Sequence, residues 1–181
     1  MRLRAEKLKK LAGARGVPVE QLAQAVAGAG LEPLDAERAV RNWMRGSDHP
    51  RCRAEHIAAM AQALGCQPPE IARFTSEVRF HRGSPRKAKL VADMVRGKPV
   101  DEALNLLTFT PQRAAVNLRK ALTAAIADAE QADADVTTLV VSETRVDGGP
   151  HIKRFQPKDR GRAHPILKRT SHLTVSVQER D

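Results

Sequence analysis

The chemistry offered by this sequence is concentrated in residues 151–172, a run of 22 residues. Cations at this density neutralise phosphates in closely spaced arrays, such as the backbone of a nucleic acid. A flexible, solvated basic loop has the same composition, so residue types alone leave both interpretations open. The run contains one anion, Asp159, and seven cations: Lys153, Arg154, Lys158, Arg160, Arg162, Lys168 and Arg169.

Other residues with chemical potential form no catalytic or metal-binding pattern. The six histidines lack the HExxH spacing of zinc-dependent proteases. Glycine-rich phosphate loops of the GxxxxGKS/T or GxGxxG type are absent. Cys52 and Cys66 lie 14 residues apart in helix-like sequence, which favours two buried thiols over a disulfide or a zinc site. We therefore expect a protein that is not an enzyme and uses no cofactor or metal.

Two strand-like segments, residues 138–146 and 166–177, flank the basic run and must position it. In the second, Leu173, Val175 and Val177 alternate at period two, which is typical of a strand with one buried face. Residues 156–161 contain proline, aspartate and glycine, which favour a chain reversal. The pattern predicts a long β-hairpin over about residues 146–172, whose distal half has little apolar surface.

Pro165 lies in the returning arm of this hairpin. Proline has no N–H to donate to a ladder, so we expect the pairing beside it to be broken or bulged.

The segment before the hairpin predicts one short strand and three helices. Residues 76–82 alternate, with Val78 and Phe80 expected to face inward. Helices follow from Ser84, which suits an N-cap, from Pro99, and from Thr110 to about residue 133. This order predicts an α+β domain: a small antiparallel sheet covered by three helices, with a protruding β-hairpin. Its core is expected to contain Leu90, Met94, Leu118, Leu122, Ile126, Val141, Leu173 and Val175.

The first 76 residues predict an all-α domain. Apolar residues recur at spacings of three and four near positions 3–11, 19–26, 36–43 and 57–64, and Pro68 and Pro69 open a last short helix through Phe74. The stretches ARGVPVEQLAQAV, NWMRG and HIAAMAQALGCQPPEI resemble the five-helix DNA-binding domain of the lambda-repressor and Cro class, over about residues 3–74. The connection at residues 28–33 looks about seven residues longer than the tight turn of that helix-turn-helix class. This domain could therefore read DNA, or it could keep the scaffold and use its surface for another role; the sequence leaves both interpretations open.

Length, charge and hydropathy indicate the number of domains, the kind of partner and the location of the protein. The 181 residues suffice for two small domains, which we place at 1–76 and 77–181. A formal net charge of +10 favours nucleic acid or an anionic membrane surface as partner. No apolar run approaches the roughly 20 residues of a membrane span, and residues 1–10 lack the apolar stretch of a secretory signal. We therefore expect a cytosolic protein.

The motifs SPRKAKLVADMVRGK, GPHIKRF, GRA and LKRTSH resemble the universal large-subunit ribosomal protein twenty-two family, over about residues 77–178. The resemblance implies a structural, non-enzymatic protein of the cytoplasmic ribosome that binds large-subunit ribosomal RNA beside neighbouring ribosomal proteins. It also implies that the hairpin tip lines the nascent-peptide exit tunnel and meets the nascent peptide. A DNA-binding regulator with an accessory RNA-binding domain is the alternative; its cations should gather after residue 33, where Asp35 and Glu37 dilute Arg38, Arg41 and Arg45.

The resemblance, taken with the charge pattern, assigns two sets of site residues. The rRNA-binding set is Arg82, Ser84, Arg86, Lys87, Lys89, Lys153, Arg154, Lys158, Arg160, Arg162, Lys168, Arg169, Thr170, Ser171 and His172. The tunnel-tip set is Arg154, Phe155, Gln156, Pro157, Lys158, Asp159, Arg160, Gly161 and Arg162.

Overall fold

The structure is a computed structural model that describes residues 1–180. Two compact units are present. The N-terminal unit contains residues 1–74 and 128–135, and the C-terminal unit contains residues 75–127 and 136–180. Each unit has its own buried apolar residues.

The N-terminal unit consists mainly of five helices. α2 packs against α3 and α4, and α1 packs against α3, α4 and α5. The buried side chains include Leu8, Leu22, Trp43, Ile57 and Met60. The helices are α1 (Ala5–Arg15), α2 (Val19–Gly28), α3 (Pro33–Met44), α4 (Ala54–Leu64) and α5 (Pro68–Ile71).

Three details of this unit differ from the sequence-based expectation. Leu3 belongs to strand β1 (Arg2–Leu3) and not to the first helix. The last helix ends at Ile71, because the chain from Ala72 enters strand β2 (Ala72–His81), whose first residues pair with β1. The connection between α2 and α3 spans only residues 29–32, since the remaining residues extend the two helices.

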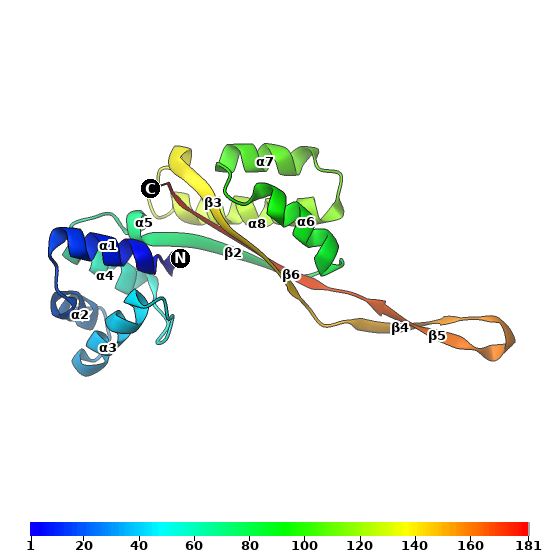
Figure 1. Cartoon of the computed structure of the whole chain (residues 1–181), viewed down its shortest axis with the longest axis horizontal. Helices are drawn as coiled ribbons and strands as arrows, with labels where there is room; N and C mark the ends of the chain where they lie inside the picture. Colours follow the sequence, from blue (N-terminus) through cyan, green and yellow to red (C-terminus); the bar gives the residue numbers. More distant parts are fainter. Residues whose placement is uncertain (181) are drawn as a thin grey trace. The chain divides into compact units, whose positions relative to one another are not determined.

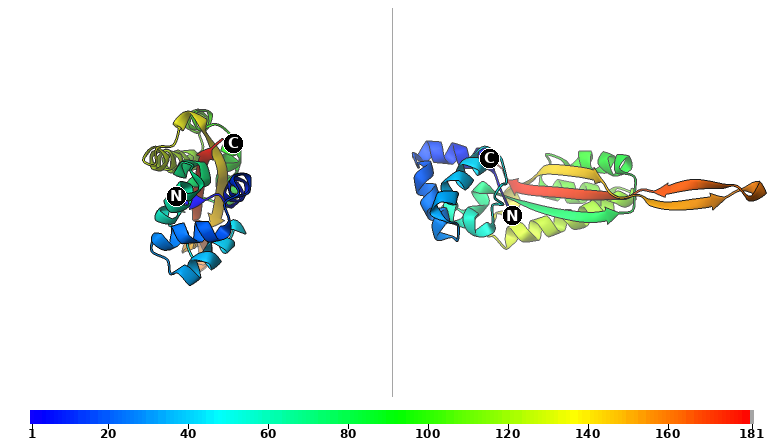
Figure 2. Two further views of the ribbon diagram at one scale, coloured as in Figure 1. Left: turned by 90° about the vertical axis from the view of Figure 1, so that its left-hand side faces the viewer. Right: turned by 90° about the horizontal axis from the view of Figure 1, so that it is seen from below.

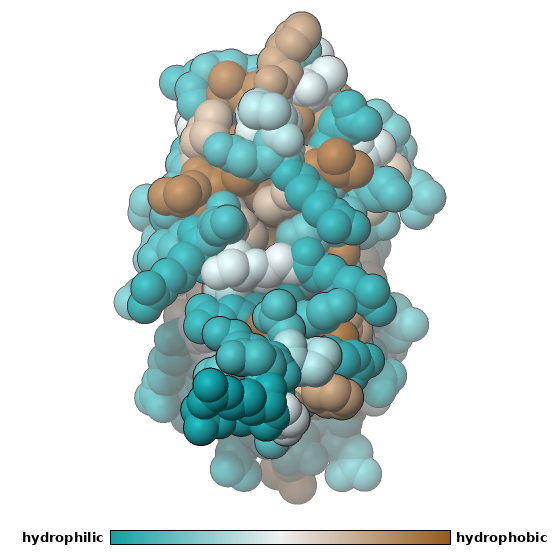
Figure 3. Space-filling view, turned by 90° about the vertical axis from the view of Figure 1, so that its right-hand side faces the viewer, coloured by the Kyte–Doolittle hydropathy of each residue, from teal (hydrophilic) through white to brown (hydrophobic). Residues whose placement is uncertain are grey.

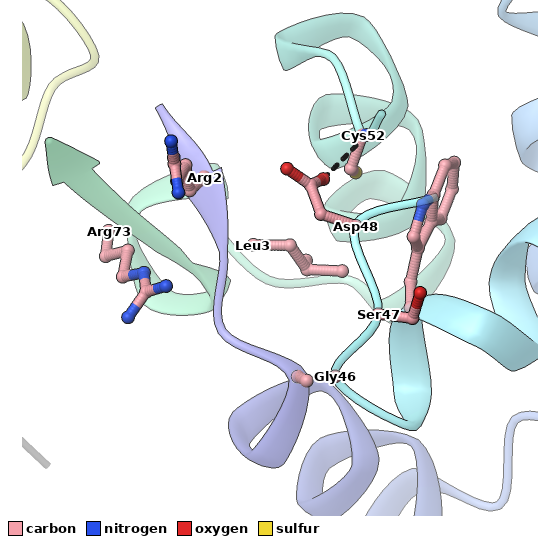
Figure 4. A pocket seen from close by; sticks show the side chains of 9 residues that line it. Arg2, Leu3, Gly46, Ser47, Asp48, Cys52 and Arg73 are labelled. Carbon is pink, nitrogen blue, oxygen red and sulfur yellow. Dashed lines mark hydrogen bonds between the residues drawn. The ribbon is translucent and has the colours of Figure 1, made fainter. Parts of the chain in front are cut away.

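Polar and aromatic contacts connect α3, the loop that follows it, and α4. Trp43 donates its indole N–H to the carbonyl of Pro50 at 2.6 Å and stacks on His56, with ring centroids 5.4 Å apart. Cys52 donates its backbone N–H to Asp48 Oδ1 at 3.1 Å (Figure 4). Burial, reinforced by Asp48, raises the pKa of the Cys52 thiol to about 12. Cys66 was expected to be buried as well but is only half-buried.

The C-terminal unit has two layers, one sheet and one set of helices, and a two-stranded ribbon extends from the sheet (Figure 1). Strands β2, β6 (Ser171–Glu179) and β3 (Leu139–Gly148) adjoin in that order, and β3 and β6 pair antiparallel. Helices α6 (Pro85–Val95), α7 (Val100–Phe109) and α8 (Arg113–Glu130) lie on one face of this sheet (Figures 1 and 2). A short 3-10 turn, η1 (Val136–Thr138), leads into β3.

The core of this unit contains six of the eight side chains that were expected there. Leu90 and Met94 are wrong, because they are 65% and 42% exposed on α6. The helix instead turns Ala88, Val91, Ala92 and Val95 inward. Alanine on the inner face lets the α6 backbone approach the sheet closely enough for Thr144 to donate its hydroxyl to the carbonyl of Ala92 at 3.0 Å.

The alternation expected for β2 reverses at its end. Phe80 has a φ of 56°, in the left-handed region that L residues seldom adopt. The change of backbone direction leaves Phe80 59% exposed and buries His81, the opposite of the expectation.

A two-stranded ribbon continues beyond the sheet (Figure 1). β4 (Ile152–Pro157) and β5 (Ala163–Lys168) pair antiparallel, and the turn between them contains η2 (Asp159–Gly161). Nearly every ribbon side chain is exposed.

The expected break at Pro165 is wrong, because Pro165 pairs in register with Phe155. Lys158 donates its N–H to the carbonyl of Arg162 at 2.7 Å, and hydrogen-bonded and non-hydrogen-bonded pairs alternate from there. Pro165 and Pro157 both fall in non-hydrogen-bonded pairs, where the backbone nitrogen faces away from the partner strand. The ladder therefore loses no donor.

Candidate nucleic-acid interface

A short junction joins the sheet to the ribbon. On the outgoing side the chain passes through residues 149–151, and on the returning side through Arg169 and Thr170. Gly149 donates its N–H to the carbonyl of Thr170 at 2.9 Å, and Thr170 donates its hydroxyl to the carbonyl of Pro150 at 2.6 Å. These two hydrogen bonds join the outgoing and returning chain between the β3–β6 ladder and the β4–β5 ladder.

Close packing at the junction requires a residue without a side chain at position 149. A Cβ there would lie 2.5 Å from Thr170 Oγ1 and 3.3 Å from the Thr170 carbonyl carbon. Thr170 is only 4% exposed, so it has little room to move.

Three of the predicted site residues hold the junction together. Thr170 and Ser171 are buried, and His172 is half-buried. His172 accepts the N–H of Phe80 at Nδ1 (3.3 Å), and the two rings meet edge to face with centroids 5.0 Å apart. These residues fix the end of β2 against β6 and so position the exposed cations beside them.

Next to the junction lies an open hollow of about 530 Å³, which we call the basic hollow. The start of α6, the start of α8 and the base of the ribbon form its walls. Among the described residues, none that line it is an aspartate or a glutamate. The lining consists of Arg82, Gly83, Ser84, Arg113, Ile152, Arg154, Leu167, Lys168, Arg169 and Thr170.

The N-terminus of α6 adds positive potential to the basic hollow. Ser84 is the N-cap residue, yet its side chain makes no capping hydrogen bond, and Pro85 follows at the first helical position. The first-turn N–H groups of a helix have no acceptor within the helix, and the helix dipole is positive at this end. Backbone and side chains therefore favour an anion at the same place.

A buried histidine packs against the turn that contributes Gly83 to the basic hollow. The Nδ1 atom of His81 lies 2.6 Å from the amide nitrogen of Asn117. Burial lowers the pKa of His81, and nearby Arg113 lowers it further. Gly83 folds closely over this ring, because a Cβ on it would lie 2.6 Å from His81 Nε2. The buried imidazole thus sets the position of the turn that carries Arg82 and Ser84.

The remaining predicted site residues lie outside the basic hollow. Arg86, Lys87 and Lys89 are exposed on α6, and Lys153 is exposed on β4. The tip carries Lys158, Arg160 and Arg162 on a turn in which Arg160 and Gly161 have φ values of 55° and 68°. Viewed end-on, the tip is mainly hydrophilic (Figure 3).

Sequence reasoning missed Arg113. It lies outside the basic run and begins α8, so only the fold brings it near Arg82 and Ser84 at the basic hollow. A signal was present, because Arg113 follows Thr110 and Pro111 as Arg86 follows Ser84 and Pro85, with a cation at a helix start in both cases.

Across residues 1–180, no group of three or more histidine, cysteine, aspartate or glutamate side chains is placed to hold a metal ion. None of the helices in that range is long and apolar enough to cross a membrane.

The family model described as ribosomal protein L22p/L17e matches residues 76–178, which is more than half of the chain. The matched range includes the sheet, its three helices, the junction and the ribbon. Members of this family are structural components of the large ribosomal subunit in the cytoplasm; they bind ribosomal RNA and neighbouring ribosomal proteins and are not enzymes. The chain therefore belongs to the ribosomal protein L22p/L17e family.

Proposed function

We propose that the basic hollow and the cations around it are the principal ribosomal RNA contact of this chain. One observation carries the proposal: five cations and an uncapped helix N-terminus converge on one concavity whose lining contains no carboxylate. Like charges held this close repel one another unless a counter-charge lies between them. Phosphates of folded RNA supply that charge, and their spacing suits cations on two neighbouring elements.

The surrounding residues extend this contact in two directions. Arg86, Lys87 and Lys89 follow α6, and Lys153, Lys158, Arg160 and Arg162 follow the ribbon, all of them exposed. Thr170, Ser171 and His172 act indirectly by fixing the junction. The contact is mainly to phosphates and to the shape of the RNA, because the chain has no tyrosine and few other aromatic residues with which to stack on bases.

The ribbon tip, residues 154–162, is proposed to line the wall of the nascent-peptide exit tunnel and to meet the nascent peptide. The resemblance of GPHIKRF and GRA to the large-subunit family supports this placement. So does the exposure of the ribbon, whose side chains have almost no partners within the C-terminal unit. A two-stranded ribbon without a packed face is marginal in water, so it needs external support of the kind that RNA provides.

The N-terminal unit is proposed to keep a lambda-repressor-like arrangement of helices as a scaffold with a role other than reading DNA. On α3, Arg41 is paired with Glu37. The groove between α2 and α3 is lined by Glu20, Ala23, Gln24, Ala27, Pro33 and Glu37. No cation lines that groove, so it offers no partner to a phosphate backbone, and the DNA-binding regulator gains no support here.

The basic hollow can be tested through Arg113, which the sequence motifs do not include. The full-length Arg113→Gln variant should bind large-subunit ribosomal RNA about 1 kcal/mol more weakly, with its log–log salt slope reduced by about 0.7–0.9. The wild-type slope should be on the order of −4 to −5 if about six phosphates are neutralised. Filter binding across a salt series measures both quantities.

The matched control is Arg145→Gln. Arg145 is an exposed cation of β3 that lies outside the basic hollow and pairs with Asp147 at 2.8 Å. This variant should keep the wild-type affinity and slope. If the two variants weaken binding equally, the net charge of the protein matters and the basic hollow does not.

A further inference from the structure

We infer that one face of the ribbon is a platform on which unstacked bases of the ribosomal RNA pack. The inference rests on the proposed RNA contact and adds a base-binding surface to its phosphate-binding cations. The observation behind it is the strand register of β4 and β5, which separates the side chains of the ribbon into two faces of different chemistry.

The few apolar side chains of the ribbon gather mostly on the same face. Residues that pair directly in an antiparallel ladder point to one face, and successive residues of a strand alternate between the two faces. Phe155 pairs with Pro165, and Pro157 pairs with Ala163. The apolar ribbon face, as we call it, therefore consists of Phe155, Pro157, Ala163, Pro165 and Leu167, with Lys153 beside Leu167; the other face carries Ile152, Arg154, Gln156, His164, Ile166 and Lys168.

The largest side chains of the apolar ribbon face are open to solvent. Phe155 is 74% exposed and Leu167 is 52% exposed, whereas Ile166 on the other face is 36% exposed. Phe155 and Pro165 form a non-hydrogen-bonded pair, the kind in which facing side chains lie closest, so their two rings adjoin. A flat apolar group that covered these rings would gain from the hydrophobic effect and from stacking.

The surrounding charges favour an anionic partner for this face. Residues 152–168 contain six cations and one anion, Asp159. Lys153 bounds the apolar ribbon face near the junction, and Lys158 follows it at the turn. A single strand of RNA presents phosphates and flat base faces in one chain, and its exposed bases commonly stack on aromatic side chains. A nascent peptide has no such regular negative charge, so unstacked RNA bases fit this face best.

The other face of the ribbon accounts for the phosphates that accompany these bases. Ile152, Arg154 and Lys168 belong to that face and line the basic hollow. Leu167 of the apolar ribbon face also borders the basic hollow, so the two surfaces adjoin at the base of the ribbon. Phosphates on the basic hollow therefore bring neighbouring bases within reach of the apolar ribbon face.

The test compares two single-stranded probes that carry the same phosphates and differ only in their bases. Hexa-adenylate RNA and an abasic RNA of the same length are titrated with the full-length protein at low salt, with fluorescence anisotropy as the readout. The adenylate should bind at least about fivefold more tightly, which is the lower end of what one stacked base contributes. Phe155→Thr should remove this preference and leave the affinity for the abasic RNA nearly unchanged, because every cation is retained.

Ile166→Thr is the matched control, since it makes the same kind of change on the other face of the ribbon. This variant should keep the preference for the adenylate. Equal affinity of the wild type for both probes, a preference that survives Phe155→Thr, or an equal loss in the two variants overturns the inference. If Arg113→Gln still weakens the binding of ribosomal RNA, the phosphate contact stands and only the base platform fails. If neither probe binds and Arg113→Gln has no effect, the proposed contact fails and the inference fails with it.

A second readout separates RNA from the nascent peptide in translating ribosomes. The full-length variant Phe155→p-azidophenylalanine carries a photoreactive ring on the apolar ribbon face. After irradiation, its cross-links should go mainly to ribosomal RNA. Cross-links mainly to the nascent chain would assign this face to the peptide and overturn the inference.

Discussion

Adding a single methyl group at the junction should weaken the attachment of the ribbon. In Gly149→Ala, the new Cβ would lie 2.5 Å from Thr170 Oγ1, where carbon and oxygen normally stay at least about 1 Å further apart. Because Thr170 is buried, it can relieve the contact only by giving up its hydrogen bond to Pro150, and the bond from Gly149 to Thr170 lengthens with it. Losing one buried hydrogen bond and adding strain costs about 2–3 kcal/mol.

Gly148→Ala is the matched control, since a Cβ at Gly148 meets nothing within 4 Å. Urea denaturation of the full-length variants gives the free energies of unfolding, and hydrogen exchange locates the change. Gly149→Ala should lose protection in peptides that cover the junction and the adjoining ends of β3 and β6; Gly148→Ala should change stability by less than about 0.5 kcal/mol.

The double variant Gly149→Ala/Thr170→Ala tests the physical cause. It removes the hydroxyl that the methyl group meets, so the two substitutions should be less than additive. Equal stabilities of the two glycine variants, or strict additivity in the double variant, would refute the reasoning about the junction.

Three further perturbations address the core, a buried titratable group and the tip. Leu118→Ala should destabilise the C-terminal unit by about 2–4 kcal/mol and Leu90→Ala by less than about 0.5 kcal/mol, because only Leu118 is buried; urea titrations that rank them the other way would contradict this. The stability of that unit should fall as the pH drops below about 6.5, since unfolded His81 takes up a proton that the folded residue, with its pKa lowered by burial and by Arg113, resists; His81→Gln should flatten this part of the profile, and an unchanged profile would exclude His81 as its source. Replacing residues 154–164 by a two-residue turn should leave helix content and melting temperature nearly unchanged but alter macrolide sensitivity or the stalling of particular nascent peptides; unfolding of the isolated protein would instead place the ribbon in the core.

Local pattern predicted much of the fold because most elements bury one face. Apolar spacing located four of the five N-terminal helices and most of the core of the C-terminal unit, and two consecutive prolines located the fifth helix. It failed on α6, where leucine and methionine look like the buried residues but alanines allow closer docking on the sheet. Hydropathy records the size of an apolar side chain, whereas helix docking here depends on how closely two backbones approach.

The departures at Phe80 and Pro165 have a different origin. A positive φ at Phe80 has no signal in a sequence that otherwise alternates, and it reverses which side chains face inward. Whether Pro165 interrupts the ladder depends on whether it falls in a hydrogen-bonded or a non-hydrogen-bonded pair. The turn several residues away decides which of the two it is.

Individual site residues were easier to predict than the site itself. The basic run contains three of the five cations that line the basic hollow, Arg154, Lys168 and Arg169. The basic hollow, however, gathers residues from three separate segments of the sequence, near positions 82–84, 113 and 152–170. Its concavity depends on that packing, which no single segment encodes.

The alternation of hydrogen-bonded and non-hydrogen-bonded pairs along the ribbon also affects how the protein behaves before it binds RNA. Each ribbon strand has one partner, so its outer edge is a template on which a strand of another molecule could assemble. Pro157 on β4 and Pro165 on β5 place a nitrogen without hydrogen on those two outer edges. Both edges are thereby interrupted, and lysine and arginine side chains repel a second copy along the rest. We therefore expect these prolines, which leave the ladder intact, to hinder unassembled chains from polymerising through their ribbons.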